Sequence, residues 1–497
     1  MPALPLVISG ARPAQRDPGV ASEVLLIPRM PEEPPAKALC PEAGSLRRNC
    51  VTFVENLAQT VGSMAPSGGL TMFIPLVFAN AGNGTWLLFV PVAAGYALLA
   101  ANINVFTSRT ASAGSFSTFA ELGLGPRAGL VAGWTYFATL TFAVADCAPS
   151  VGFYAAQVAS QLGLHMPSAV AVSLVAGSVA AAWWAARRGI SLSTNLMLGV
   201  ECLSLGTMVA LAVLFIIHTG KWFDADQLHL TGVKPRGMRL GIILAFMSLT
   251  GFESVTTLGE ESKHALKAIP RAILACILPI GLLYLTMAYV VTMAFRGSGL
   301  DLAQTFVPFD YLAVAAGWPH LAIVVGIGIT LSFFACMLGC MNAAARVLFS
   351  MSRRGQFWPG FGIAHPVNAT PHRAIALVGI VAMVLPLALV ACGVRLEDGM
   401  AYGAQLASLG FVSTYLWACI SVPFFLGRRG ELRWYHIALS ASALMIFGFA
   451  LAATLYPAPP APWDLLPYVF AGTVVAGTVL SWALGLQSRP READQPA

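Results

Sequence analysis

The stretch Met247-Ser-Leu-Thr-Gly-Phe-Glu-Ser-Val-Thr-Thr-Leu-Gly-Glu-Glu-Ser262 begins inside an apolar run and ends in charged residues. Its middle places Gly251, Phe252 and the carboxylate of Glu253 where hydrocarbon is expected. An ionisable side chain at membrane depth costs about 2.5–3.5 kcal/mol on insertion scales, so we expect Glu253 to face the protein interior or a watery cavity. The glycine beside it marks a place where a spanning helix can break, and broken helices are tolerated only where they line a cavity. We therefore predict one half of a binding site here.

The composition predicts a membrane protein. Hydrophobic residues make up 57% of the chain and charged residues 10%, whereas soluble domains carry roughly 25% charged residues. The net charge of +6 comes from basic residues that stand singly or in pairs at the ends of apolar runs, which is typical of loops beside a bilayer and does not indicate nucleic-acid binding. The sequence contains no GxxxxGK[ST], HExxH or GxSxG motif, so we predict no enzyme and no cofactor.

The nine cysteines include no CxxC pair, so the sequence predicts neither a disulfide framework nor a metal site. Cys336 and Cys340 fall one helical turn apart, on one face of a helix. We expect them to serve close helix packing.

Apolar runs long enough to span a bilayer, about 20 residues each, occur twelve times. We place them near 51–79, 85–106, 127–160, 168–186, 189–218, 238–259, 270–295, 320–350, 373–393, 400–426, 435–456 and 464–486. Residues 1–48 contain nine prolines and charges of both signs, so we expect a disordered tail there, and a second short tail over 488–497.

Basic residues predict the orientation. With the amino terminus in the cytoplasm, 22 of the 28 lysines and arginines fall on the inner side and 6 on the outer side. Positive residues concentrate on the cytoplasmic side of membrane proteins. We therefore expect both termini in the cytoplasm and the chain in the cytoplasmic membrane, with the lipid bilayer as its surroundings.

A sequence pattern that occurs twice predicts an internal repeat. Phe116-x3-Ala120-x5-Pro126 precedes the third run, and Phe309-x3-Ala313-x5-Pro319 precedes the eighth, a shift of 193 residues. Spans one to five would then repeat as spans six to ten, inverted because five is odd, and inverted repeats with interrupted helices are typical of secondary transporters. The predicted parts are a first repeat over 49–219, a second over 237–426, and two further helices over 434–487.

The first span carries the second predicted break, at Pro66-Ser67-Gly68-Gly69. Proline removes a backbone donor, and glycines accept unusual dihedrals. A half-helix starting near Gly69 would present free N–H groups and a positive dipole end, which suit a carboxylate. The carbonyls of Met64 and Ala65 would suit an ammonium group. The alternative is a simple proline kink.

The sixth span is predicted to complete this site. The carbonyls of Thr250 and Gly251 can accept from the same ammonium group, and Phe252 can cover the ligand as a gate. Glu253 would either orient the unwound backbone or take part in proton coupling. The alternative for Glu253 is a helix cap with no part in transport.

Other ionisable residues within the spans are candidates for binding or gating. Asp146 and Glu201 are each predicted to bind a proton or a cationic substrate group, or to make a structural hydrogen bond. Arg346, near the inner end of span eight, is predicted to pair with Glu260 or Glu261 as an inner gate, or to extend to the membrane interface.

Three motifs carry a family resemblance. They are Gly251-Phe252-Glu253-x6-Glu260-Glu261-Ser262-x7-Pro270-Arg271-Ala272-Ile273; Asn342-x3-Arg346-x4-Met351-x-Arg353-x-Gly355 followed by Pro371-His372; and Gly114-x-Phe116 with Gly125-Pro126-x2-Gly129-x3-Gly133-Trp134. In this order they resemble the amino acid–polyamine–organocation (APC) permeases. The resemblance implies an all-α polytopic membrane protein with the leucine-transporter fold: five-plus-five inverted repeats, discontinuous helices 1 and 6, and two extra helices. It also implies uptake or exchange of an amino acid or amine.

The chain departs from the family at two places. The first helix usually breaks at Gly-x-Gly, where this chain has Pro66-Ser67-Gly68-Gly69, and some proton-coupled members carry a lysine in helix five, where the nearest match here is Ser204. We expect coupling to protons, or exchange. The alternatives are a sodium-coupled symporter, for which Ser332 is the available hydroxyl in span eight, and a sensor or channel on the same scaffold. The oligomeric state stays open.

Overall fold

A computed structural model of the chain describes residues 44–456 and 460–484. The predicted tails over 1–48 and 488–497 lie outside these residues, apart from 44–48. The described part contains twelve helices long and apolar enough to cross a membrane, which confirms the predicted number and order of spans.

Ten of the spans follow a single helix over most of their length. They are α3 (Thr85–Thr107), α5 (Pro126–Gln161), α6 (Ser168–Arg188), α7 (Ile190–Thr219), α10 (Ala265–Phe295), α12 (Leu321–Arg353), α13 (His372–Ala391), α14 (Leu396–Arg428), α15 (Trp434–Leu455) and α16 (Leu466–Ala483). Span one comprises α1 (Phe53–Met64) and α2 (Pro66–Ala81). Span six comprises α9 (Met238–Met247) and the 3₁₀ helix η1 (Phe252–Leu258).

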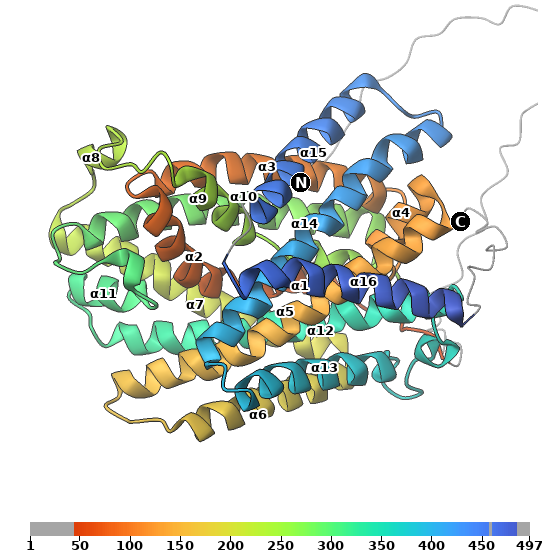
Figure 1. The fold of residues 1–497 in the computed structure, drawn as a ribbon, viewed down its shortest axis with the longest axis horizontal. Helices are drawn as coiled ribbons and strands as arrows, with labels where there is room; N and C mark the ends of the chain where they lie inside the picture. The colour runs from red at the N-terminus through yellow and green to blue at the C-terminus, as the bar shows by residue number, and fades with distance from the viewer. Residues whose placement is uncertain (1–43, 457–459, 485–497) are drawn as a thin grey trace, which may run out of the picture. The chain divides into compact units, whose positions relative to one another are not determined.

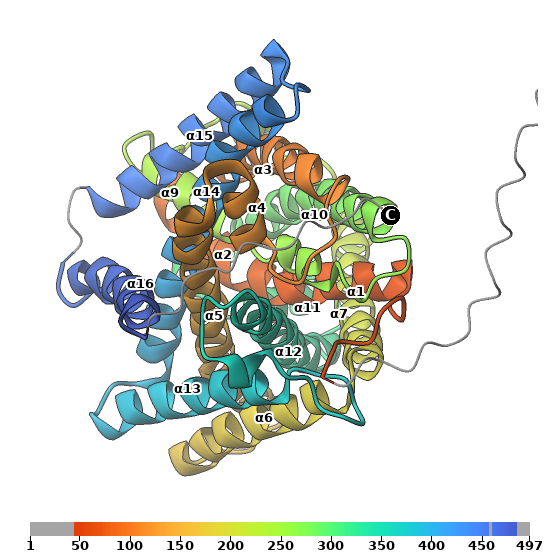
Figure 2. The ribbon, with the colours of Figure 1, turned by 90° about the vertical axis from the view of Figure 1, so that its right-hand side faces the viewer.

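Burial separates inner from outer spans. In an 18-residue apolar stretch of α5, 89% of the residues are buried, whereas the corresponding share in α15 is 22%. The long helix α5 packs against both α12 and α14, and the end-on view of Figure 2 shows α6, α13, α15 and α16 around them. Helices that are apolar on every side are typical of membrane spans, so the outer faces of these four helices are suited to lipid.

Two short helices precede the third and eighth spans. They are α4 (Phe116–Leu124) before α5 and α11 (Pro308–Ala315) before α12. The two copies of the repeated sequence pattern begin at Phe116 and Phe309, so each copy begins at the start of one of these short helices.

The start of span one is attached to the segment that follows span six. Thr52 and Glu55 form a capping box at the first turn of α1, which satisfies backbone donors that a helix start leaves free. The N–H groups of Cys50 and Val51 both donate to the carbonyl of Glu261, at 2.8 and 2.9 Å. The two segments therefore come together at this end of the molecule.

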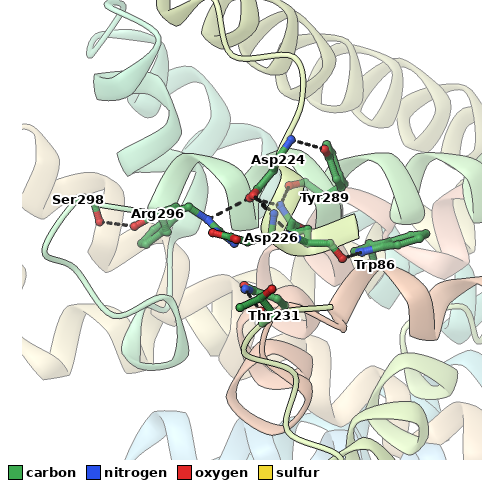
Figure 3. A network of polar contacts seen from close by, with 10 residues as sticks. Trp86, Asp224, Asp226, Thr231, Tyr289, Arg296 and Ser298 are labelled. Atoms are coloured by element: carbon green, nitrogen blue, oxygen red, sulfur yellow. Dashed lines mark hydrogen bonds and ion pairs between the residues drawn. The ribbon is translucent and has the colours of Figure 1, made fainter. Parts of the chain in front are cut away.

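A second polar network attaches α8 (Ala225–Leu228), in the connection between spans five and six, to span seven (Figure 3). The carboxylate of Asp224 caps α8 and accepts from Nε of Arg296 at 3.0 Å. Arg296 also pairs with Asp226, and the hydroxyl of Tyr289 accepts from the backbone N–H of Asp224 at 2.7 Å. These contacts hold the connection against the end of α10.

Candidate functional site

The site is built on the junction within span one. The helix α1 ends at Met64, and Ala65 adopts a left-handed conformation with φ 44° and ψ 58°. For a residue with a Cβ this conformation costs on the order of 1–3 kcal/mol and is kept only where the surroundings impose it. Pro66 then opens α2 as its first residue, where proline is favoured because its missing N–H would have no helical partner. The predicted break over Pro66-Ser67-Gly68-Gly69 is therefore wrong in its place: these four residues form the first turn of α2, and Ala65 is the one residue between the two helices.

The junction within span six lies directly against it. The helix α9 ends at Met247, and Gly251 takes a φ of +100° before η1 begins. A Cβ on Gly251 would stand 2.4 Å from the carbonyl oxygen of Ser63. Only glycine therefore allows the two backbones to approach this closely.

A cavity of about 70 Å³ lies between the two junctions. This volume is several times the roughly 10–15 Å³ that one water molecule requires. Its walls come from spans one, three, six, eight and ten: Ser63, Met64, Ala65, Gly69, Met72, Phe73, Ala143, Asp146, Cys147, Met247, Ser248, Thr250, Phe333, Cys336, Cys340, Ala404, Ala407, Ser408 and Phe411.

The cavity gathers part of the predicted site. Met64, Ala65, Gly69 and Thr250 line it, together with Asp146 from span three. The other predicted ligand residues lie beside the cavity and not in its wall: Pro66, Ser67, Gly68, Gly251, Phe252 and Glu253. The role of each as a substrate ligand stays a prediction.

Asp146 supplies the charge of the cavity. It is the single charged side chain in the wall, and within the described residues its buried Oδ1 has no hydrogen-bond partner. A carboxylate in apolar surroundings needs a counter-charge or a proton. The arrangement is suited to receiving an ammonium group or a proton from the cavity.

The side chain of Glu201, on α7, lies against the first turn of α2. The hydroxyl of Ser67 donates to Oε2 of Glu201 at 3.1 Å, and the hydroxyl of Ser332 donates to Oε1. The N–H of Gly68 reaches the Ser332 hydroxyl at 3.5 Å. The positive end of α2, which we predicted to meet a substrate carboxylate, thus meets a carboxylate of the protein itself in this structure. Ser204, also on α7, is buried, and its hydroxyl has no hydrogen-bond partner within the described residues.

The side chains after the second junction point into the core. Phe252 is fully buried and packs edge-on against Tyr96, with ring centroids 5.8 Å apart. The carboxylate of Glu253 accepts from the Tyr415 hydroxyl at 2.9 Å. As a gate, Phe252 would have to leave this aromatic cluster.

Arg346 pairs with Glu261 in the interior. Nη2 of Arg346 donates to Oε1 of Glu261 at 3.0 Å, and its Nε donates to Oε2. The two side chains are 1% and 3% exposed, so this is a buried ion pair with two hydrogen bonds. Glu260 accepts from the N–H of Ala113 at 3.4 Å. The gating role of these residues stays a prediction.

Several lining residues were not singled out in the sequence. They are Met72, Phe73, Cys147, Phe333 and Phe411, all within apolar runs. Because these helices are apolar on every side, the sequence pattern contains no signal for the face that meets the cavity.

The twelve apolar helices of the described residues, five of which line the cavity, are those of a multi-pass membrane protein. Residues 57–458 match the family described as amino acid permease. The chain therefore belongs to the amino acid permease family, within the APC superfamily.

Curated relatives agree with this membership. The chain is 26% identical over 374 residues to the branched-chain amino acid permease BcaP of Bacillus subtilis, covering 71% of this chain and 76% of that protein. It is 24% identical over 339 residues to the methylthioribose transporter of the same organism, covering 65% and 71%. It is 26% identical over 315 residues to the low-affinity putrescine importer PlaP of Escherichia coli, covering 59% and 66%.

Proposed function

We propose that this permease is a secondary transporter that moves an amino acid or a related amine across the cytoplasmic membrane by alternating access. The observation that carries the proposal is the cavity where the junctions of spans one and six meet, with Asp146 in its wall. Small-molecule sites of secondary transporters lie at interrupted helices near the middle of the bilayer.

The proposed architecture is that of inverted repeats. Spans one to five and six to ten are the two repeats, spans one and six are discontinuous, and spans eleven and twelve are additional. Support comes from the backbone turns at Ala65 and Gly251 and from the short helices α4 and α11 that precede the third and eighth spans. The proposed orientation has both termini in the cytoplasm, which the distribution of basic residues supports.

Substrate recognition is assigned to two groups. Asp146 pairs with the substrate's ammonium group, because an amine is stabilised in an apolar cavity only beside an opposite charge. The carbonyls near Ala65 and Thr250 complete the contacts to the amine. A substrate carboxylate, where one is present, would bind at the first turn of α2 in place of Glu201, because the N–H of Gly69 already donates to the carbonyl of Ala65 at 2.8 Å. The relatives' names cover branched-chain amino acids, methylthioribose and putrescine, so the family admits solutes with and without a carboxylate.

Coupling is assigned to a proton on Glu201. Its carboxylate joins Ser67 of span one to Ser332 of span eight, so gain or loss of a proton changes a contact between two elements of the site. Asp146, Ser204 and Glu253 are the other candidates. A sodium-coupled symporter at the same hydroxyl groups and an exchanger are the nearer alternatives; a sensor or channel is the more distant one.

Reconstitution into liposomes tests the proposal. A carrier gives saturable counterflow of a labelled amino acid or amine. Ohmic conductance without counterflow would identify a channel, and binding without flux would identify a sensor; either result would overturn the proposal. Imposed proton and sodium gradients, applied separately, then decide the coupling ion.

A further inference from the structure

The wall of the cavity is rich in sulfur. The chain has 17 methionines and 9 cysteines among its 497 residues, about one residue in nineteen. Among the nineteen lining residues, six carry sulfur: Met64, Met72, Cys147, Met247, Cys336 and Cys340. They come from spans one, three, six and eight, so four separate spans contribute sulfur-containing residues to the wall of one cavity.

None of the lining cysteines is tied up in a disulfide. The three lining cysteines are unpaired thiols. Sγ of Cys336 lies 3.9 Å from Sγ of Cys340 and donates to the carbonyl of Ser63 at 3.1 Å. Behind the wall, Sγ of Cys276 donates to Sδ of Met64 at 3.4 Å. The cavity wall therefore contains polarisable side chains where a typical core has only hydrocarbon.

Aromatic rings stand among these sulfur atoms. Phe73, Phe333 and Phe411 also line the cavity, and Phe333 is held in place by stacking on Tyr154, with centroids 5.2 Å apart and planes 13° from parallel. Sulfur about 5 Å from an aromatic ring, often at its edge, makes a favourable contact. A sulfur atom on the substrate would find both rings and thioethers within the same small space.

We propose that the substrate carries an unbranched side chain with a thioether or thiol, as in methionine or the amine formed by its decarboxylation. This inference rests on the proposed function and names the substrate class of that site. The ammonium group pairs with Asp146, and the sulfur-bearing chain lies among the rings and sulfur atoms. Methionine side chains are flexible and repack around a straight chain, whereas a branched chain needs a wider space.

Whether the protein prefers sulfur or methylene in the substrate separates this proposal from a site that only buries apolar surface. Replacing the substrate's sulfur by a methylene gives norleucine, which has the same length and is more hydrophobic. A hydrocarbon pocket stabilises the more apolar chain, because burial of apolar area sets the gain. A preference for sulfur over methylene therefore requires specific contacts to the sulfur atom.

The test is competition in counterflow with the full-length protein in liposomes. Labelled L-methionine is the driver, and two matched pairs compete: L-methionine against L-norleucine, and 3-(methylthio)propylamine against n-pentylamine. We expect the sulfur member of at least one pair to compete about two- to tenfold better, the size of one sulfur–aromatic contact. Equal or better competition by both methylene members would overturn the inference.

Substitutions then locate the effect. Met72→Leu with Met247→Leu removes two thioethers at similar volume, and we expect the ratio between matched competitors to fall to about one. Met445→Leu, on the 69% exposed side chain of Met445 in α15, is the control and should keep the wild-type ratio. An unchanged ratio in the double variant would contradict the proposal.

Failure of the inference can be told from failure of the proposed function. If labelled L-alanine or L-leucine undergoes counterflow but sulfur gives no advantage, the substrate class is wrong and the carrier stands. If none of these amino acids or amines undergoes counterflow or shifts the thermal transition of the purified protein, the proposed function fails and the inference with it.

Discussion

The hydroxyl of Ser67, in the first turn of α2, donates to the carboxylate of Glu201 on α7 at 3.1 Å. This contact places an acidic side chain at the positive end of a helix that also forms one wall of the cavity. A helix start is a site for an anion, so Glu201 and a substrate carboxylate would compete for the same surroundings. We therefore expect a change in the protonation of Glu201 to alter its hydrogen bond to Ser67, and so to affect span one.

Glu201→Gln is expected to separate coupling from substrate exchange. The amide keeps the shape: its oxygen accepts from one of the two hydroxyls, Ser67 or Ser332, and its NH₂ group donates to the other. It cannot bind and release a proton. We expect accumulation driven by a proton gradient to fall at least tenfold, with counterflow kept within about threefold of wild type. Liposome uptake with and without an imposed gradient measures both.

Glu431→Gln is the matched control: this half-buried carboxylate pairs with Arg109 and Arg429 away from the cavity, and its variant should keep both activities. Gradient-driven accumulation at the wild-type level in Glu201→Gln would show that the coupling proton lies elsewhere.

Asp146→Asn is expected to weaken substrate binding. The change removes the single charge in the wall of the cavity, and hydrogen bonds to charged groups contribute about 1.5–3 kcal/mol, so KM should rise roughly 10- to 100-fold. Counterflow over a range of substrate concentrations gives KM. Asp398→Asn, outside the cavity, should leave KM unchanged; the same KM in Asp146→Asn would exclude Asp146 as the ammonium partner.

Gly69→Ala is expected to abolish uptake through a steric clash. A Cβ at Gly69 would lie 2.1 Å from the hydroxyl oxygen of Tyr284 and 3.4 Å from the carbonyl oxygen of Ser248. Adding Tyr284→Phe removes the clashing oxygen, so the double variant should regain thermal stability and part of its uptake. Full uptake in Gly69→Ala alone would mean that α2 tolerates a side chain against Tyr284.

Arg346 and Glu261 are expected to be more costly to change singly than together. Removing one partner of a buried ion pair leaves an uncompensated charge and costs about 3–5 kcal/mol, whereas removing both can be close to neutral. We expect Arg346→Gln and Glu261→Gln each to lower the Tm of the purified protein clearly, and the double variant to lie nearer to wild type. A double variant that is less stable than both single variants would indicate independent roles.

Asp310 should make stability depend on pH. Burial raises its pKa to about 6, against the opposing effect of a hydrogen bond from Gln161 at 2.6 Å, whereas a free aspartate has a pKa of about 3.9. The folded state therefore binds this proton more tightly than the unfolded state does. The stabilisation from protonated Asp310 is complete below about pH 4 and is lost as the pH rises to about 6. The pH dependence of Tm should be reduced in Asp310→Asn; identical profiles for the two proteins would contradict this.

The sequence predicted the spans and the turn at Gly251, and it placed the first turn one residue too late, because these features depend on local signals. Apolar length gives the spans, and Pro66 and Gly251 mark sites where helical dihedrals or hydrogen bonds cannot continue. It also narrowed the partner of Arg346 to two neighbouring carboxylates, because a buried guanidinium requires an opposite charge.

The surroundings of the turns were not predictable in the same way. Whether Ser67 meets a substrate or Glu201 depends on how α7 is rotated against α2, and Phe252 turns toward Tyr96 because an aromatic cluster offers more contact there. The sulfur atoms of the cavity come from helices that are apolar on every side, so no periodicity marks the inward face. These features are set by tertiary packing.

Protection of Cys336 from a small thiol reagent tests most directly whether substrate binds between the two junctions. Purified protein is treated with methyl methanethiosulfonate with and without a solute that undergoes counterflow, and modification is measured at Cys336 in the cavity and at the exposed Cys392. We predict that saturating solute slows modification of Cys336 severalfold and leaves Cys392 unchanged. Equal modification of Cys336 with and without the solute would contradict the account.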